Sequence, residues 1–131
     1  MPKEIIRTEL VPRPRAGYSQ AWTVTGAKLI FVAGQVSVDM DGNPVGVGDA
    51  VVQTRTVLDN LKGVVESAGA HMRDVIKLNI YVTNMAEYRE KALEIRQEYF
   101  PQDFPASTLV EVKSLARPEL MVEIEAIAAV D

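Results

Sequence analysis

The residue of this sequence best suited to chemistry is Glu123, a carboxylate inside the otherwise apolar, strand-like segment 121–130. A buried carboxylate is unfavourable unless a partner stabilises it or it stays protonated, and such a group can accept and donate protons. Glu125 lies two residues further on, on the same face of the predicted strand. Two such carboxylates are also typical of a partly solvated interface, where Lys113 or an arginine would neutralise their charges. Taken in isolation, the two carboxylates favour this structural interpretation.

Tyr18 and Gly34 are weaker candidates for a binding site. Tyr18 follows a proline-containing loop, and a tyrosine after a rigid turn can close a pocket by stacking on a ligand or donating a hydrogen bond. Alone, it is better explained as a tyrosine of the core or of its rim. Gly34 stands inside a predicted strand, where glycine often marks a bulge or a close backbone approach. Simple crowding beneath a neighbouring strand would also explain it.

The composition excludes several classes of function. The 131 residues fit one domain, residues 1–131, with room for a core. The net charge of −4 argues against a general nucleic-acid or anionic-membrane surface, because such a surface needs a basic face. The chain has no cysteine and one histidine, His71, so it lacks the cysteine and histidine side chains from which zinc sites and serine–histidine triads are usually built. No signal peptide or membrane span is evident, so we expect a cytoplasmic protein.

Apolar residues at alternating positions predict strands, and apolar residues three and four apart predict helices. Asp49 and Asn84 are expected to cap the two helices, Gly69 to follow the end of the first, and Pro101 to end the second. The predicted order is strands at 5–8, 21–25 and 29–38, a helix at 51–68, a strand at 75–82, a helix at 85–99, and strands at 104–112 and 121–130.

Two helices can cover only one face of a sheet, yet the segment 29–36 is apolar on both faces. Left uncovered, the second face would be a large exposed apolar patch. The simplest remedy is packing against further copies of the chain in a closed ring. We therefore expect an oligomer.

Five short motifs, in their order and spacing, resemble the RidA family, also called YjgF/YER057c/UK114, over nearly the whole chain. The motifs are Gly17-Tyr18-Ser19-Gln20, Ala33-Gly34-Gln35-Val36, Leu58-Asp59-Asn60-Leu61, Phe104-Pro105-Ala106-Ser107 and Val122-Glu123-Ile124-Glu125-Ala126. The resemblance implies an α+β fold of the chorismate-mutase-like (bacillus) type, with a mixed sheet and two helices on one face. It also implies a homotrimer with small-molecule clefts between its subunits.

The same resemblance implies hydrolysis of reactive enamines and imines to keto acids and ammonia, with no cofactor or metal and with no nucleic-acid or membrane partner. Water must add to the carbon of a C=N bond and ammonia must leave, and one carboxyl group can serve both steps. Glu123 matches the family's glutamate and is the expected catalytic residue. The residues expected at the substrate are Tyr18, Ala33, Gly34, Ser107, Leu109 and Arg117.

Three positions depart from the pattern of the active deaminases. Ser107 replaces an arginine that grips the substrate carboxylate, Ala33 replaces a serine, and Ala92 or Leu93 replaces an asparagine. A charge-assisted contact contributes roughly 1.5–3 kcal/mol and a neutral hydroxyl contact roughly 0.5–1.5 kcal/mol, so we expect binding of an imino acid to weaken about tenfold or more. The substrate then either lacks a carboxylate there or is held by another base, such as Arg117 or Lys113.

The sequence therefore leaves three candidate functions. The first is a hydrolase or deaminase of small enamines or imines, supported by Glu123 and Tyr18. The second is a non-catalytic or regulatory trimer that binds a metabolite in the same cleft, supported by the three altered positions. The third, the endoribonuclease L-PSP activity sometimes attached to this family, is the weakest, because the chain is acidic and has a single, poorly placed histidine.

Overall fold

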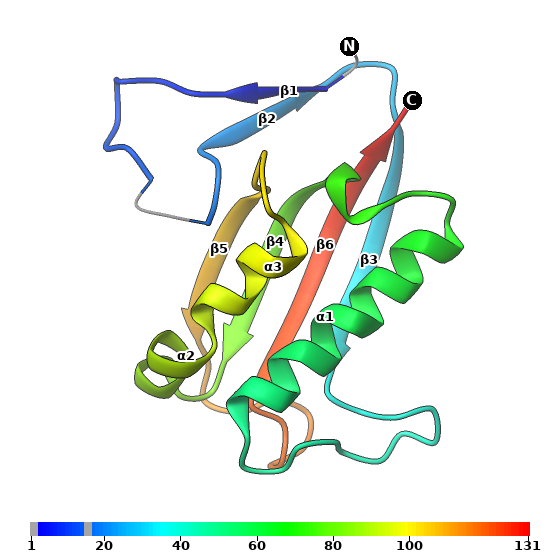
Figure 1. Cartoon of the computed structure of the whole chain (residues 1–131), viewed down its shortest axis with the longest axis vertical. Helices are drawn as coiled ribbons and strands as arrows, with labels where there is room; N and C mark the ends of the chain where they lie inside the picture. Colours follow the sequence, from blue (N-terminus) through cyan, green and yellow to red (C-terminus); the bar gives the residue numbers. More distant parts are fainter. Residues whose placement is uncertain (1–2, 15–16) are drawn as a thin grey trace.

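The structure is a computed structural model that describes residues 3–14 and 17–131. A two-stranded antiparallel ribbon consists of β1 (Lys3–Ile6) and β2 (Ala21–Val24). A larger sheet has the spatial order β3 (Lys28–Val36), β6 (Val122–Val130), β4 (Val75–Val82) and β5 (Ala106–Glu111). β6 is antiparallel to both of its neighbours and β4 is parallel to β5, so the sheet is mixed, as the family resemblance implies (Figure 1).

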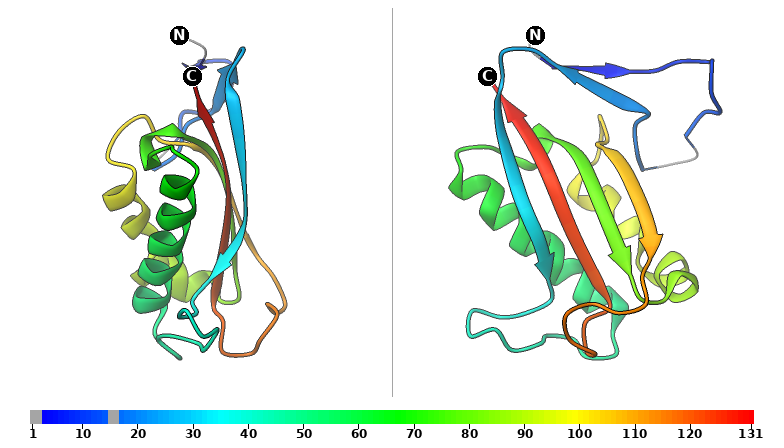
Figure 2. Two further views of the ribbon diagram at one scale, coloured as in Figure 1. Left: turned by 90° about the vertical axis from the view of Figure 1, so that its right-hand side faces the viewer. Right: turned by 180° about the vertical axis from the view of Figure 1, so that it is seen from behind.

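The helices of the described chain lie on one face of the larger sheet (Figure 2). They are α1 (Ala50–Ser67), the 3₁₀ turn η1 (Met72–Asp74), α2 (Met85–Lys91), the 3₁₀ turn η2 (Leu93–Ile95) and α3 (Arg96–Tyr99). Together with the sheet they make an α+β fold. No helix within the described ranges is both long and apolar enough to cross a membrane.

The predicted ends of α1 are both confirmed. The Asp49 side chain accepts a hydrogen bond from the backbone N–H of Val52 at 3.0 Å, which satisfies one of the unpaired donors at the helix start. Gly69 follows the helix end with a φ of 84°, a left-handed conformation that glycine adopts without strain. The apolar stripe of α1 packs on the sheet and forms the core. The buried side chains of this contact include Val57, Leu58, Leu61 and Val65 with Leu78, Ile80, Val122 and Ile124.

The second predicted helix, 85–99, is wrong as a single element. Asn84 caps it as expected, accepting from the N–H of Glu87 at 3.0 Å, but the helix divides at Ala92, whose φ of −128° is not helical. The N–H of Ile95 then bonds to the carbonyl of Ala92, three residues back, in the tighter 3₁₀ pattern. The tighter turn shifts the phase of the chain, so that two consecutive side chains, Ile95 and Arg96, are both buried.

The second face of the larger sheet is not covered by any described helix (Figure 2). Phe31 and Leu29 of β3 remain 72% and 43% exposed there, and Val110 of β5 is 40% exposed. The prediction that β3 presents apolar side chains on a face without helices is therefore confirmed. We call this surface, with the exposed side chains of Leu29, Phe31 and Val110, the open face.

Asp74 at the end of η1 joins the first strand to the main sheet. Its carboxylate accepts hydrogen bonds from Lys3 Nζ at 2.9 Å and from the backbone N–H of His71 at 2.8 Å, while Lys3 also donates to the carbonyl of Ala129 at 2.8 Å. Burial alone would raise the pKa of Asp74. The hydrogen bonds and the charges of Lys3 and Arg73 outweigh this effect and hold the pKa below its usual value.

We predict that Asp74→Ala lowers the free energy of unfolding by about 1–2 kcal/mol at pH 7. Because the pKa is lower in the folded state, this contribution is complete above the unfolded-state pKa of about 3.9 and disappears as the pH falls through the folded-state value. Urea denaturation of wild type and variant at several pH values measures the difference. The exposed Asp41→Ala is the control and should change stability by less than about 0.5 kcal/mol. A difference that persists unchanged well below pH 3 would contradict this account.

Candidate functional site

Glu123 lies on the open face of β6, directly over the backbone of Gly34 in β3. The pairing register of these strands shifts between Val32 and Gln35, which is a bulge. A Cβ atom built on Gly34 would lie 2.7 Å from Glu123 Cδ and closer still to Glu123 Oε2. The bulge that a strand glycine often marks is thus present. The group that approaches Gly34 is a side chain of the neighbouring strand β6, which is the crowding named as the alternative explanation. Only a residue without a side chain leaves room for the carboxylate in this position.

Glu125, the second carboxylate of β6, has a structural partner. The Tyr81 hydroxyl donates to Glu125 Oε1 at 2.6 Å, and this hydrogen bond raises the pKa of Tyr81. Glu123 is paired in register with Tyr81 on the same face, yet no hydrogen bond to its carboxylate is found within residues 3–14 and 17–131. The structural interpretation therefore suits Glu125, while the carboxylate of Glu123 remains able to take a ligand or a water molecule.

Tyr18, Ser107 and Leu109 line a cleft of about 500 Å³ on the other side of the molecule. The other residues that line it are Pro12, Arg13, Arg89, Leu93 and Arg96. Of the two positions considered for the altered asparagine, Leu93 therefore lines the cleft, and Ala92 is buried. Residues from the N-terminal segment, α2, η2, α3 and β5 thus meet in one cleft.

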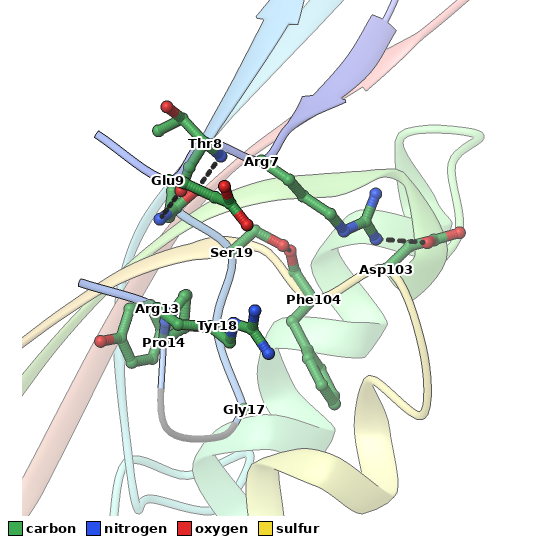
Figure 3. A pocket seen from close by; sticks show the side chains of 11 residues that line it. Arg7, Thr8, Glu9, Arg13, Pro14, Gly17, Tyr18, Ser19, Asp103 and Phe104 are labelled. Carbon is green, nitrogen blue, oxygen red and sulfur yellow. Dashed lines mark hydrogen bonds and ion pairs between the residues drawn. The ribbon is translucent and has the colours of Figure 1, made fainter. Parts of the chain in front are cut away.

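Tyr18 is held at the start of β5 by its neighbours in the sequence. The backbone N–H of Ser19 donates to the carbonyl of Pro105 at 2.9 Å, and the Ser19 hydroxyl and the Trp22 indole N–H both donate to the carbonyl of Phe104. A second pocket, of about 630 Å³, lies where residues from 7–14 and 17–20 face Asp103 and Phe104 (Figure 3). Tyr18 lines both pockets and is therefore well placed to separate or close them.

Arg96 is a cleft residue that the sequence analysis missed. It is only 6% exposed, and its Nη1 donates to Ser107 Oγ at 3.4 Å. A Cβ atom on Gly17 would lie 2.8 Å from Arg96 Nε, so the guanidinium also rests against the Gly17 backbone. Burial lowers the pKa of Arg96, while Tyr88 and Tyr18 raise it. An arginine remains charged at any ordinary pH.

The signal for Arg96 was present in the sequence. Position 96 lies four residues after Ala92 and three before Tyr99, which is within the apolar stripe predicted for this helix. Arg96 is a charged residue within an apolar helix stripe, just as Glu123 is a charged residue within an apolar strand, and both patterns single out a candidate site residue. Arg13 and Arg89 give no such signal, because both are exposed.

The predicted site residues lie on two opposite faces of the sheet. Ser107 and Leu109 are paired in register with Leu78 and Ile80, which are fully buried beneath the helices. Side chains that face each other across a strand pair point to the same side of a sheet, so Ser107 points to the helix side and Glu123 to the open face. Within one chain, the structure does not bring these two residues together.

The remaining predicted residues also separate. Ala33 is exposed in the bulge beside Gly34, on the Glu123 side of the molecule. Arg117 is exposed in the loop before β6, where it donates to the carbonyl of Gly42 at 2.8 Å and lies 3.9 Å from Glu119. It does not line either of the two pockets described above.

Comparison with known proteins identifies the family. Residues 8–130 match the family model described as endoribonuclease L-PSP. A RutC family protein of Pyrococcus abyssi is 40% identical over 128 residues, which cover 98% of each chain. The 3-aminoacrylate deaminase RutC of Acinetobacter baylyi is 36% identical and covers 99% of this chain and 100% of its own.

Two further relatives extend the comparison. A 2-iminobutanoate/2-iminopropanoate deaminase of Dermatophagoides farinae is 34% identical over 130 residues, covering 99% of this chain and 98% of its own. The crystal structure of a Rid family protein of unknown function from Yersinia pestis superposes with a TM-score of 0.88 at 36% identity, over 99% of this chain and 100% of that one. The chain therefore belongs to the RidA family, as its motifs indicated.

We predict that Gly34→Ala leaves the protein folded and displaces the Glu123 carboxylate. The obstructed atoms are the far end of a flexible side chain, so the stability loss should stay near or below about 1 kcal/mol. In a Glu123→Ala background, where the obstructing atoms are absent, the same substitution should be milder by a measurable coupling energy. Thermal unfolding of the four proteins of this cycle provides the measurement. Equal effects of Gly34→Ala in both backgrounds would show that the glycine does not accommodate the carboxylate.

Proposed function

We propose that this protein hydrolyses reactive enamines or imines to carbonyl compounds and ammonia. The observation that carries the proposal is the carboxylate of Glu123, held against the Gly34 backbone on an open sheet face and left without a hydrogen-bond donor among the described residues. Relatives that cover almost the whole chain are named as deaminases of 3-aminoacrylate and of 2-iminobutanoate or 2-iminopropanoate. Their names support the reaction class.

In the proposed mechanism, Glu123 moves protons in two steps. Its carboxylate takes a proton from water as the water oxygen bonds to the carbon of the C=N group, and the nitrogen gains the π electrons and a proton. The resulting carbinolamine then loses its hydroxyl proton to a base, the C–N bond breaks, and the nitrogen leaves as ammonia after receiving a proton. A single carboxyl group that alternates between base and acid serves both steps. An enamine enters the same route after protonation at carbon gives the iminium ion.

The proposed active site lies between two copies of the chain in a homotrimer of the chorismate-mutase-like type. One copy supplies Glu123 and Gly34 from its open face, and a neighbour supplies Tyr18, Ser107 and Leu109 from its cleft. Two observations support this arrangement. These groups point to opposite sides of a single sheet, and the open face carries the exposed side chains of Leu29 and Phe31, which a neighbour would cover.

The serine at position 107 favours a broad substrate class in this proposal. A neutral hydroxyl cannot hold a carboxylate as strongly as a guanidinium does, and the difference is about tenfold in affinity or more. Ala33 beside the glutamate and Leu93 in the cleft remove two further polar groups. The proposal therefore covers reactive enamines and imines in general, and does not depend on an imino acid held by residue 107.

We predict that Glu123→Gln lowers kcat by about 10²-fold or more, because the amide keeps the shape of the side chain and loses its ability to accept the water proton. Ammonia release from 2-iminobutyrate, 2-iminopropionate and uncharged imines measures the effect. Glu125→Gln, on the same strand and face, is the matched control and should retain activity within a few-fold. Turnover at the wild-type rate by Glu123→Gln would exclude this mechanism.

We also predict that the protein in dilute solution has the mass of three chains, measured by light scattering or sedimentation. Phe31→Lys places a charge in the expected contact between copies and should shift the mass towards one chain, with the fold retained. The control is Val64→Lys on the exposed side of α1, which should keep the mass of the wild type. A wild-type protein that is monomeric and folded would refute the assembly.

A non-catalytic trimer that binds a small metabolite is the second candidate, favoured by the three positions that depart from the pattern of the active deaminases, namely Ala33, Ser107 and either Ala92 or Leu93. One measurement distinguishes this binding role from the proposed hydrolase. A ligand that raises the melting temperature while no imine is hydrolysed by the purified protein would support the binding role.

A further inference from the structure

The cleft beside Ser107 is strongly cationic in a protein whose net charge is −4. Three of the eight lining residues that the structure describes are arginines, namely Arg13, Arg89 and Arg96, and none of the eight is acidic. A concave site lined by charges of one sign concentrates ligands of the opposite sign. The cleft therefore favours a small anion over a neutral molecule.

Arg96 differs from the other two arginines in its burial. Arg13 and Arg89 are exposed, so their attraction for an anion is screened by water and salt. Arg96 is 6% exposed and is enclosed between the Gly17 backbone on one side and Ser107 on the other. Its guanidinium is thus held in place before a ligand arrives, which reduces the entropy lost on binding.

The contact between Arg96 and Ser107 forms a composite anion site. Ser107 Oγ accepts from Arg96 Nη1 at 3.4 Å, so the hydroxyl hydrogen of Ser107 can point to a ligand oxygen. A guanidinium presents planar pairs of N–H donors that match the two oxygens of a carboxylate. One carboxylate can therefore take hydrogen bonds from both residues at once.

We infer that Arg96 is the residue that binds the carboxylate of the substrate, together with Ser107, and that the substrates are small enamines or imines bearing a carboxylate. This inference rests on the proposed function, and it names the substrate class of the same cleft. The charge that an arginine at position 107 would supply comes instead from Arg96, the first residue of the short helix α3. The role assigned to Arg96 is substrate binding and specificity, and the proton transfers remain with Glu123.

The first test measures binding of 2-oxobutyrate, the stable keto acid that hydrolysis of 2-iminobutyrate releases. Calorimetry on the wild type, Arg96→Met and Arg96→Lys should show affinity at least about tenfold weaker for the methionine variant and several-fold weaker for the lysine variant. The lysine variant retains a charge and a long apolar stem, so it guards against loss of the fold. Arg73→Met, an exposed arginine that does not line the cleft, is the control and should change affinity by less than about threefold.

The second test moves the guanidinium group from position 96 to position 107, its partner in the contact. Adding Ser107→Arg to Arg96→Met places a guanidinium on the other partner and should restore most of the lost affinity for 2-oxobutyrate. Ser107→Arg alone should bring no gain, because two guanidinium groups would then compete for one small space. In steady-state kinetics, the Arg96 variants should raise KM for 2-iminobutyrate and leave kcat/KM for an uncharged imine within a few-fold of wild type.

The inference would be overturned if folded Arg96→Met and Arg96→Lys bound 2-oxobutyrate as tightly as the wild type. It would also be overturned if the wild type did not bind this keto acid. The two proposals fail separately. Deaminase activity that is indifferent to Arg96 removes the inference and leaves the proposed function. Arg96-dependent binding of 2-oxobutyrate without ammonia release from any imine removes the proposed function and leaves the anion site.

Discussion

The sheet β3–β6–β4–β5 has helices on one face only, and this layering determines where each polar side chain can act. The helix side is filled by the stripe of α1 and by the buried residues of β4 and β6, and polar groups meet in a cleft at the edge beside β5. Ser107 and Arg96 lie at that edge, whereas Glu123 lies on the open face. A chemical site that uses both groups requires the open face of one copy to meet the edge of another. The apolar exposed surface of β3 would provide the free energy for that contact.

Each of the two charges proposed to act in the site lies against a glycine. Glu123 rests on Gly34 within the bulge of β3, and Arg96 rests on Gly17, whose φ of 77° is left-handed. In both places an added Cβ atom would lie within 3 Å of the charged group. Bare backbone lets a charge stay at the edge of an apolar layer without a competing side chain. The two glycines thus leave the space in which the charged groups lie.

Local patterns in the sequence predicted most of the elements. The alternation in β4, the stripe of α1 and the caps Asp49 and Asn84 depend on neighbours within a few residues, so they could be predicted without the fold. The division of the helix 85–99 could not, because its apolar residues keep the same spacing through the 3₁₀ turn η2. Arg96 was missed for a related reason. Its meaning depends on Gly17 and Ser107, which the folded chain brings to it from other elements. The separation of Ser107 from Glu123 likewise follows from the pairing of distant strands. Ser107 is in register with the buried Leu78 and Glu123 with Tyr81, so the two side chains point to opposite faces of the sheet.

The most direct test of a site built from opposite faces of two copies is complementation between two defective subunits. Glu123→Ala and Arg96→Met chains would be purified separately, unfolded, mixed in equal amounts and refolded. Hydrolysis of 2-iminobutyrate would be measured at a concentration well below KM, where Arg96→Met alone should retain about a tenth of the wild-type rate or less. If each site draws Glu123 from one copy and Arg96 from its neighbour, random mixing gives about a quarter of the sites both wild-type residues, and a matching fraction of activity returns. Mixed assemblies that form but are no more active than Arg96→Met alone would contradict a shared site.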